Sequence, residues 1–154
     1  MSKTYIRVDD RLIHGQITTT WIQHLNIKSI VVADDKTSSN PMIKSIIAMA
    51  APPKIVTKII KVEEAYAVMK ENLVKNINQL VIVKLPETLP KVCFKDIHIE
   101  KIIVGTVIKK STSIKQIGTN VFLTKEDIDA LNLAKEEGCE VEVRMLPNSS
   151  SVKW

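Results

Sequence analysis

The sequence predicts an α/β fold, a single-domain, open and mostly parallel β-sheet of about seven strands with helices on both faces. A length of 154 residues suits one domain spanning 1–154. Short β-branched runs alternate with segments of helical periodicity, which is typical of parallel strands joined by crossover helices. Apolar residues make up 45% of the chain and charged residues 25%, the balance of a globular protein rather than of a disordered one.

Seven segments are predicted as strands because each is short, rich in β-branched residues and bounded by polar residues. They are Tyr5 to Asp9, Ser29 to Asp34, Ile55 to Ile60, Leu80 to Lys84, Lys101 to Gly105, Asn120 to Leu123 and Glu140 to Met145. The runs Ile30 to Ala33 and Leu80 to Val83 are apolar at consecutive positions, which indicates strands covered on both faces. The last segment alternates between polar and apolar residues, which predicts a sheet edge with one solvent-facing side and is compatible with antiparallel pairing.

Helix signals separate these strands. A first helix is expected to begin near Gly15 or Gln16. Asn40 followed by Pro41 predicts the cap and first position of a second helix, which Pro52 and Pro53 end. Its apolar stripe consists of Met42, Ile43, Ile46, Ile47 and Ala50.

Two further helices and a tail follow. A stripe at helical spacing is formed by Val62, Ala65, Met69 and Leu73. Thr124 and Asp127 have the spacing of a capping box, and Gly138 is placed to end the helix that they begin. Asn148 to Ser151 is interpreted as a loose tail.

Composition excludes several classes of function. The formal net charge of +5 favours an acidic partner, but the aromatic residues are too few and scattered for a platform that stacks nucleic-acid bases, so no nucleic-acid partner is expected. Cys93 and Cys139 form no CxxC pair and are interpreted as buried, reduced thiols. No signal peptide and no apolar run long enough for a membrane span are present, so a cytoplasmic location is expected.

One strand-to-helix loop carries most of the reactive side chains. Asp9, Asp10, Arg11, His14 and Gly15 lie between the first strand and the first helix, followed by Gln16. In an open parallel sheet, ligands bind beyond the carboxyl ends of the strands, where such loops gather. Asp34 and Asp35 at the end of the second strand, and Gly105 and Thr106 at the end of the fifth, are expected neighbours of this loop.

This set of residues suits phosphoryl chemistry. A largely neutral imidazole lets His14 attack phosphorus without a separate base. Arg11 supplies a fork of N–H donors for phosphate oxygens, while Gly15 lets the backbone approach the anion at the helix start. Asp10, or one of Asp34 and Asp35, is expected to hold the second imidazole nitrogen.

Two alternatives remain open at this point. His14 with Asp10 and Asp34 or Asp35 has the residue types for a divalent metal site of a hydrolase, although the fixed charge of Arg11 and the absence of HxH or HExxH spacing disfavour it. The second alternative is a regulatory paralogue, which keeps the fold and has lost transport. Polar turns and solvated faces are the simpler interpretations of Asp34-Asp35 and of Lys109-Lys110.

The segment from Val8 to Gln16, VDDRLIHGQ, resembles the active-site segment of the IIB component of the phosphoenolpyruvate-dependent sugar phosphotransferase system, mannose/fructose/sorbose family. Thr20-Trp21, Val31 to Asp35 and Ala50 to Pro53 are similar to the family as well. The similarity runs over nearly the whole chain.

The resemblance implies a phosphocarrier with a transient phosphohistidine and no other cofactor or metal. His14 would accept a phosphoryl group on Nδ1 from a histidine of a IIA protein or domain, with Asp10, Arg11, Gly15 and Gln16 shaping its loop. It would then pass the group to a sugar held by the membrane IIC and IID components, so peripheral association with the transporter is expected. A homodimer is compatible with the alternating strand.

One segment departs from the family. Gly105-Thr106-Val107 stands where the family commonly has two glycines and a methionine. Glycine adopts positive φ easily and threonine does not. Either the loop differs here, or Thr106 offers its hydroxyl to the phosphate.

Overall fold

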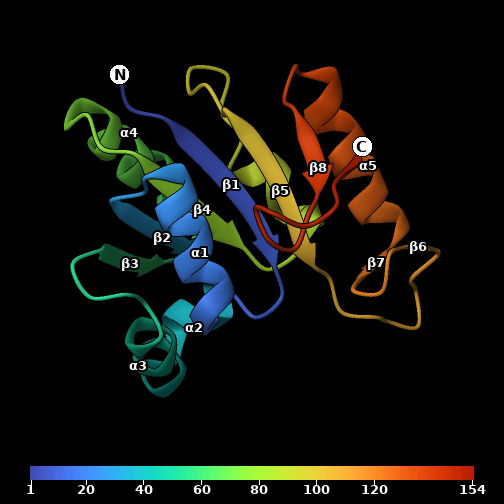
Figure 1. Cartoon of the computed structure of the whole chain (residues 1–154), viewed down its shortest axis with the longest axis horizontal. Helices are drawn as coiled ribbons and strands as arrows, with labels where there is room; N and C mark the ends of the chain where they lie inside the picture. The colour runs from blue at the N-terminus through green and yellow to red at the C-terminus, as the bar shows by residue number, and fades with distance from the viewer.

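A seven-stranded sheet with strand order β3-β2-β4-β1-β5-β8-β9 organises the computed structural model, which describes residues 1–154 (Figure 1). Its strands are β1 (Thr4–Asp9), β2 (Ser29–Ala33), β3 (Val56–Ile60), β4 (Gln79–Val83), β5 (Lys101–Thr106), β8 (Val141–Val143) and β9 (Val152–Lys153). Every neighbouring pair is parallel except β8 and β9. The carboxyl ends of β1, β2, β4 and β5 therefore gather at one edge of the sheet, called the carboxyl edge below.

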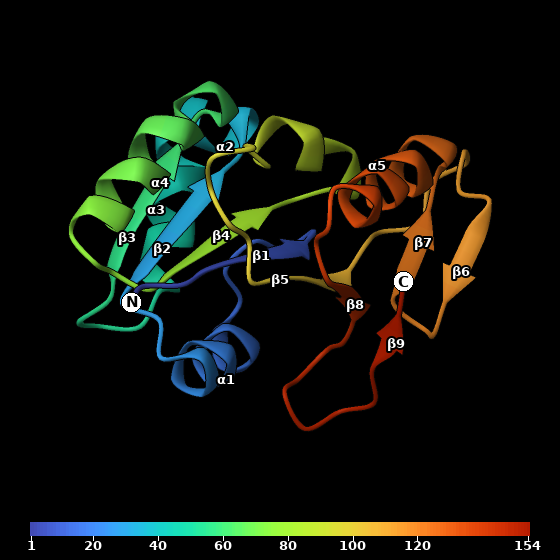
Figure 2. The same ribbon diagram turned by 90° about the horizontal axis from the view of Figure 1, so that it is seen from above.

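Helices cover both faces of the sheet, as predicted. They are α1 (Gly15–Leu25), α2 (Asp35–Ser39), α3 (Pro41–Met49), α4 (Ala65–Val74) and α5 (Lys125–Glu136), with 3-10 turns at η1 (Val62–Glu64) and η2 (Pro86–Lys91). Figure 2 shows α4 and α5 on one face and α1 on the other. The sheet is thus the middle of three layers, which explains the consecutive apolar residues of its central strands.

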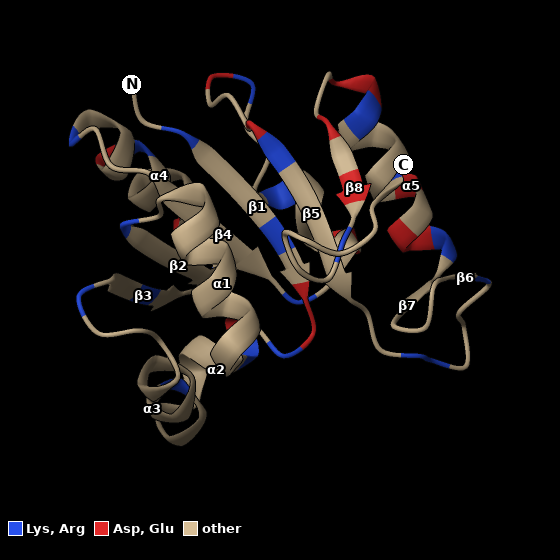
Figure 3. Cartoon of the chain, in the orientation of Figure 1, with Lys and Arg blue, Asp and Glu red and all other residues tan.

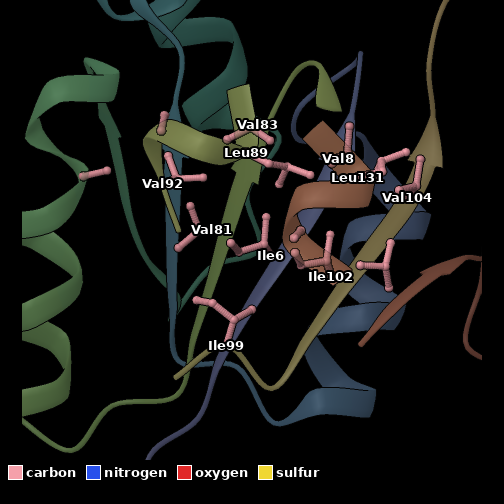
Figure 4. Packing of buried hydrophobic residues seen from close by; sticks show 14 of the residues in the cluster. Ile6, Val8, Val81, Val83, Leu89, Val92, Ile99, Ile102, Val104 and Leu131 are labelled. Carbon is pink, nitrogen blue, oxygen red and sulfur yellow. The ribbon is translucent and has the colours of Figure 1, made fainter. Parts of the chain in front are cut away.

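Two hydrophobic clusters hold these layers together. The larger, with 20 buried residues, joins the central strands to η2, α4 and α5 and includes Ile6, Val81, Ile102 and Leu131 (Figure 4). The smaller, with 10 buried residues, lies on the other side of the sheet and includes Leu12 and Ile13 of the loop after β1. This loop is therefore anchored by its apolar residues while its polar residues lie free of the core.

The predicted starts of two helices are confirmed. Asn40 accepts hydrogen bonds from the amides of Met42 and Ile43, directly before Pro41 at the start of α3. Thr124 and Asp127 form a reciprocal capping box at α5. Each of these contacts satisfies amide groups that a helix start otherwise leaves unpaired.

The prediction that Asn120 to Leu123 is a strand of the main sheet is wrong. This segment forms β7 (Val121–Leu123), which pairs with β6 (Lys115–Ile117) in a separate antiparallel ribbon. A short turn connects the two strands, and the nearby partner is available without the longer connection that joining the parallel sheet requires.

The prediction of a strand with antiparallel pairing near the sheet edge at Glu140 to Met145 is confirmed, but its solvent-facing side is not. The segment forms β8, which is parallel to β5 and antiparallel to the edge strand β9. Glu142 is buried because its carboxylate accepts a hydrogen bond from Ser151 and pairs with Lys101 and Arg144. Its polar position is thus satisfied by protein rather than by water.

The expected loose tail is instead an ordered turn. The backbone amide of Ser149 donates to the carbonyl of Leu146, and the Ser149 hydroxyl lies between the amide and carbonyl of Leu146. This turn reverses the chain and leads it into β9, so the residues from Asn148 to Ser151 connect two paired strands.

Candidate functional site

His14 lies at the carboxyl edge, between the end of β1 and the start of α1. It is the N-cap residue of α1, with extended backbone at φ −141°, and its amide donates to the Thr18 hydroxyl. Its side chain is 16% exposed. The imidazole is therefore held by the fold on one side and accessible from solvent on the other.

The second nitrogen of the imidazole is fixed by Asp9. His14 Nε2 lies 2.7 Å from Asp9 Oδ2, and a carboxylate only accepts hydrogen bonds, so Nε2 carries the proton and donates it. The side chain of Asp9 has no exposed surface. The prediction that Asp10, Asp34 or Asp35 holds this nitrogen is wrong, because the last residue of β1 itself turns its carboxylate to the ring.

A network of four residues satisfies the buried Asp9 carboxylate. Oδ1 accepts from the Arg11 amide at 3.0 Å and from the Thr106 hydroxyl at 2.7 Å. Oδ2 accepts from Arg7 Nε at 3.3 Å in addition to His14. A carboxylate with no exposed surface and four hydrogen-bonding partners has one fixed orientation, which fixes the ring that it holds.

Arg7 supplies the countercharge for Asp9 and is missing from the predicted site. Its guanidinium is 2% exposed, lies 3.3 Å from Asp9 Oδ2, and donates to the carbonyls of Arg144 and Met145. Burial is the largest influence on this group and lowers the pKa of Arg7, while Asp9 opposes the shift. A charged residue between Ile6 and Val8, in a strand that is buried on both faces, is the sequence signal that points to such a pair.

Gly105 makes room for this guanidinium. A Cβ atom at that position would lie 2.1 Å from Arg7 Nη2 and 2.5 Å from Cζ. Glycine is therefore required in β5 by the close approach of Arg7 and not by an unusual backbone angle. Gly105 is a neighbour of the site, as predicted, but acts on Arg7.

Thr106 and Asp10 lie together beside Asp9. The Thr106 hydroxyl lies 2.6 Å from Asp10 Oδ1 and 2.7 Å from Asp9 Oδ1, and the Asp10 amide donates to the Thr106 carbonyl. Thr106 thus connects the two carboxylates of the loop.

The rest of the loop leaves donors free at its surface. Arg11 and Gln16 are exposed, and neither side chain makes a hydrogen bond or ion pair. Gly15 adopts φ +48°, and Leu12 adopts φ 61°, which is unusual for a residue with a side chain. The helix α1 begins directly after His14 without a side-chain cap, so no side chain satisfies the amides of its first turn.

Asp34 and Asp35 serve the fold instead of this loop. Asp34 caps α2 by accepting from the amide and hydroxyl of Thr37, and Asp35 accepts from the Val62 amide. No cluster of three or more His, Cys, Asp or Glu side chains with the arrangement of a metal site is present. The ligand set of the hydrolase alternative is therefore not assembled.

The two cysteines lie at the opposite edge, before β5 and β8. Cys93 and Cys139 both line a cavity of about 500 Å³. Burial raises the pKa of the Cys93 thiol to about 12 and, more weakly, that of Cys139. Both thiols are free and partly buried, so neither is a thiolate at neutral pH.

Comparison with known proteins identifies relatives over the whole fold. The family model described as "PTS system sorbose subfamily IIB component" matches residues 3–154. The sorbose-specific EIIB component of Lacticaseibacillus casei is 28% identical over 148 residues, which cover 96% of this chain and 90% of that protein. The crystal structure of the IIBSor domain of the sorbose permease from Klebsiella pneumoniae superimposes with a TM-score of 0.88 at 27% identity, covering 99% and 93% of the two chains.

One of the relatives is longer than this chain. The mannose-specific EIIAB component of Escherichia coli is 24% identical over 147 residues, which are 96% of this chain and 45% of that protein. The chain thus spans about half the length of this relative.

Proposed function

The chain belongs to the sorbose subfamily of phosphotransferase-system IIB components, and on this premise we propose that it is a phosphocarrier that bears its phosphoryl group on His14. The hydrogen bond from His14 Nε2 to Asp9 carries the proposal. It leaves Nδ1 as the nitrogen with a free lone pair, and that atom is the nucleophile.

The reaction moves one phosphoryl group between two imidazoles. The lone pair of His14 Nδ1 forms a bond to phosphorus while the N–P bond of the donor histidine breaks, and the electron pair of that bond stays on the donor ring. His14 keeps its Nε2 proton throughout. The positive charge that develops on its ring is stabilised by the buried Asp9 carboxylate, 2.7 Å away.

Donors around His14 bind the phosphoryl oxygens in this proposal. The unpaired guanidinium of Arg11 forms a fork on two oxygens, and the uncapped amides at the start of α1 complete the anion site. Gly15 allows close approach, and the Gln16 amide is an additional donor. Asp10 is held back from the phosphate by Thr106, so it acts on the loop and not on the anion.

The partners follow from family membership. A IIA protein or domain supplies the phosphoryl group, and a sugar bound by membrane IIC and IID components receives it. No helix of this chain has the length and apolar character needed to cross a membrane. We propose that it acts in the cytoplasm, attached peripherally to the transporter.

Mass spectrometry tests this function. After incubation with the phosphorylated IIA partner, the protein is expected to gain one phosphoryl group that is labile in acid, stable in base and located on His14. His14→Ala removes the modification and leaves the fold intact, because a loop residue contributes little to the core. Arg11→Ala is expected to slow uptake by on the order of 10² to 10³. A phosphorylated His14→Ala protein contradicts the proposal.

A further inference from the structure

An unpartnered apolar face lies on the side of the molecule that carries His14. Met42, Ile43, Ile46 and Met49 point outward from α3 and are 74%, 43%, 59% and 84% exposed. Their spacing places them on one side of the helix. We call these four side chains the α3 flank. Large exposed apolar groups gathered in this way mark interaction surfaces rather than random exposure.

The opposite side of α3 connects it to the phosphorylation loop. Ile47 and Ala50 pack against the smaller core cluster, which also contains Leu12 and Ile13 of that loop. Figure 1 shows α3 at the same edge of the sheet as the connection between β1 and α1. Both α3 and the segment that presents His14 are therefore anchored to the same core cluster.

A second apolar surface lies on the other side of β1. The loop that follows β5, the strand next to β1, exposes Ile108 by 58% and Ile114 by 68%, with Lys109 and Lys110 between them. We call these four residues the β5–β6 flank. The two flanks follow parallel strands on either side of β1, so His14 lies between them.

The β5–β6 flank contains two lysines, and the chain segment that carries the α3 flank is also basic. From Lys36 to Lys61 the chain has five lysines and no aspartate or glutamate. Lys36, Lys44 and Lys54 form no salt bridge in the structure. In Figure 3 the loop after β5 likewise carries the blue of Lys and Arg and none of the red of Asp and Glu. A partner for this surface has apolar groups to cover the flanks and carboxylates around them.

We propose that the α3 flank and the β5–β6 flank form the docking surface for the phosphoryl-donor protein, an inference that rests on the proposed function. Transfer requires the donor imidazole to reach His14 Nδ1, so the donor must cover the surface around that atom. A specific interface buries about 800 Å² on each partner, so a donor that reaches His14, which is itself 16% exposed, also contacts surface beyond that side chain. Flanks on both sides of His14 extend the contact and orient it.

Docking and chemistry are separated by using two phosphoryl donors. Ile46→Ser/Met49→Ser is expected to lower the rate of His14 phosphorylation by the phosphorylated IIA partner at least about tenfold, because truncation of central apolar contacts weakens binding by that order. Phosphoramidate, a small donor that needs no docking, is expected to phosphorylate the variant at the rate of the unchanged protein. Val74→Ser is the matched control, since Val74 is 85% exposed at the far end of α4.

Three outcomes overturn the inference. Equal rates with the IIA partner for the variant and the unchanged protein exclude the α3 flank from docking. A rate that falls equally with phosphoramidate assigns the effect to the site and not to docking. Normal IIA-dependent phosphorylation combined with lost binding to phosphatidylglycerol vesicles assigns the surface to the membrane. Failure of the unchanged protein to be phosphorylated by either donor instead contradicts the proposed function.

Discussion

The Nε2 atom of His14 lies 2.7 Å from Oδ2 of Asp9, a carboxylate without exposed surface at the end of β1. The pairing fixes which ring nitrogen holds the proton and, in the proposed reaction, which one attacks phosphorus. Arg7 and Thr106 hold Asp9 in turn, from its own strand and from β5. The His14 ring is thus positioned by the sheet, although it lies on a loop.

Asp9→Asn tests this arrangement. An asparagine side chain can donate to Nε2, which moves the imidazole proton to Nδ1 and removes the nucleophilic lone pair. Phosphoryl uptake from the IIA partner is expected to fall by on the order of 10² to 10⁴. Asp10→Asn is the control and is expected to change the rate less than tenfold, because Asp10 does not touch the ring. Equal rates for Asp9→Asn and the unchanged protein would show that Asp9 does not set the tautomer.

Gly105→Ala is expected to destabilise the fold through Arg7. The added Cβ meets the guanidinium at 2.1 Å, so Arg7 must give up contacts with Asp9 or with the carbonyls of Arg144 and Met145. A loss of about 1 to 3 kcal/mol in the free energy of unfolding follows, measured by guanidinium denaturation.

A double-mutant cycle identifies the cause of that loss. In an Arg7→Lys background the guanidinium is absent, so Gly105→Ala is expected to cost less than it does alone. Additive effects of the two substitutions would mean that Gly105 is required for another reason.

Thr106→Val removes the hydroxyl between Asp9 and Asp10 at nearly constant volume. Asp9 then loses one of the donors that fix its carboxylate, so the His14 ring is held less firmly and phosphoryl uptake is expected to slow about three- to tenfold. Thr106→Ser keeps the hydroxyl and is expected to retain the original rate. An unchanged rate in Thr106→Val, or an equal loss in Thr106→Ser, would leave the hydroxyl without this role.

The thiol of Cys93, at the edge of the sheet opposite the carboxyl edge, allows a test of its burial by pH. Burial raises the pKa of its thiol from 9.0 to about 12, so the folded state favours the neutral form. This stabilisation is fully present below pH 9.0 and is lost as the pH rises toward about 12. At pH 8, iodoacetamide is expected to alkylate Cys93 on the order of 10² times more slowly in the folded than in the unfolded protein. Similar rates in both states would contradict the burial of this thiol.

Much of the fold was predictable because its signals are local. The cap at Asn40, the capping box from Thr124 and the β-branched runs each depend on residues close together in the chain. The position of Glu140 to Met145 was not, because burial of Glu142 depends on Lys101 and Ser151. Alternation alone does not distinguish a solvated carboxylate from one paired inside the protein.

The site was predictable as a segment but not as a network. The residue types from Asp9 to Gln16 point to this loop and to His14 as the proposed phosphoryl acceptor. The choice of Asp9 over Asp10 as partner of the ring coincides with a register irregularity between Val8 and Asp9 in the pairing with β5, which local sequence does not reveal. The role of Arg7 depends equally on Gly105, which is far away in the sequence and adjacent in the sheet.

The nitrogen that carries the phosphoryl group tests the central claim most directly. Nitrogen-15 and phosphorus-31 NMR of uniformly labelled, phosphorylated protein distinguishes the two ring positions of His14 by their coupling to phosphorus. The pairing of Nε2 with Asp9 predicts phosphorus on Nδ1 and a proton retained on Nε2. Phosphorus on Nε2 of His14, or on Cys93 or Cys139, would contradict it.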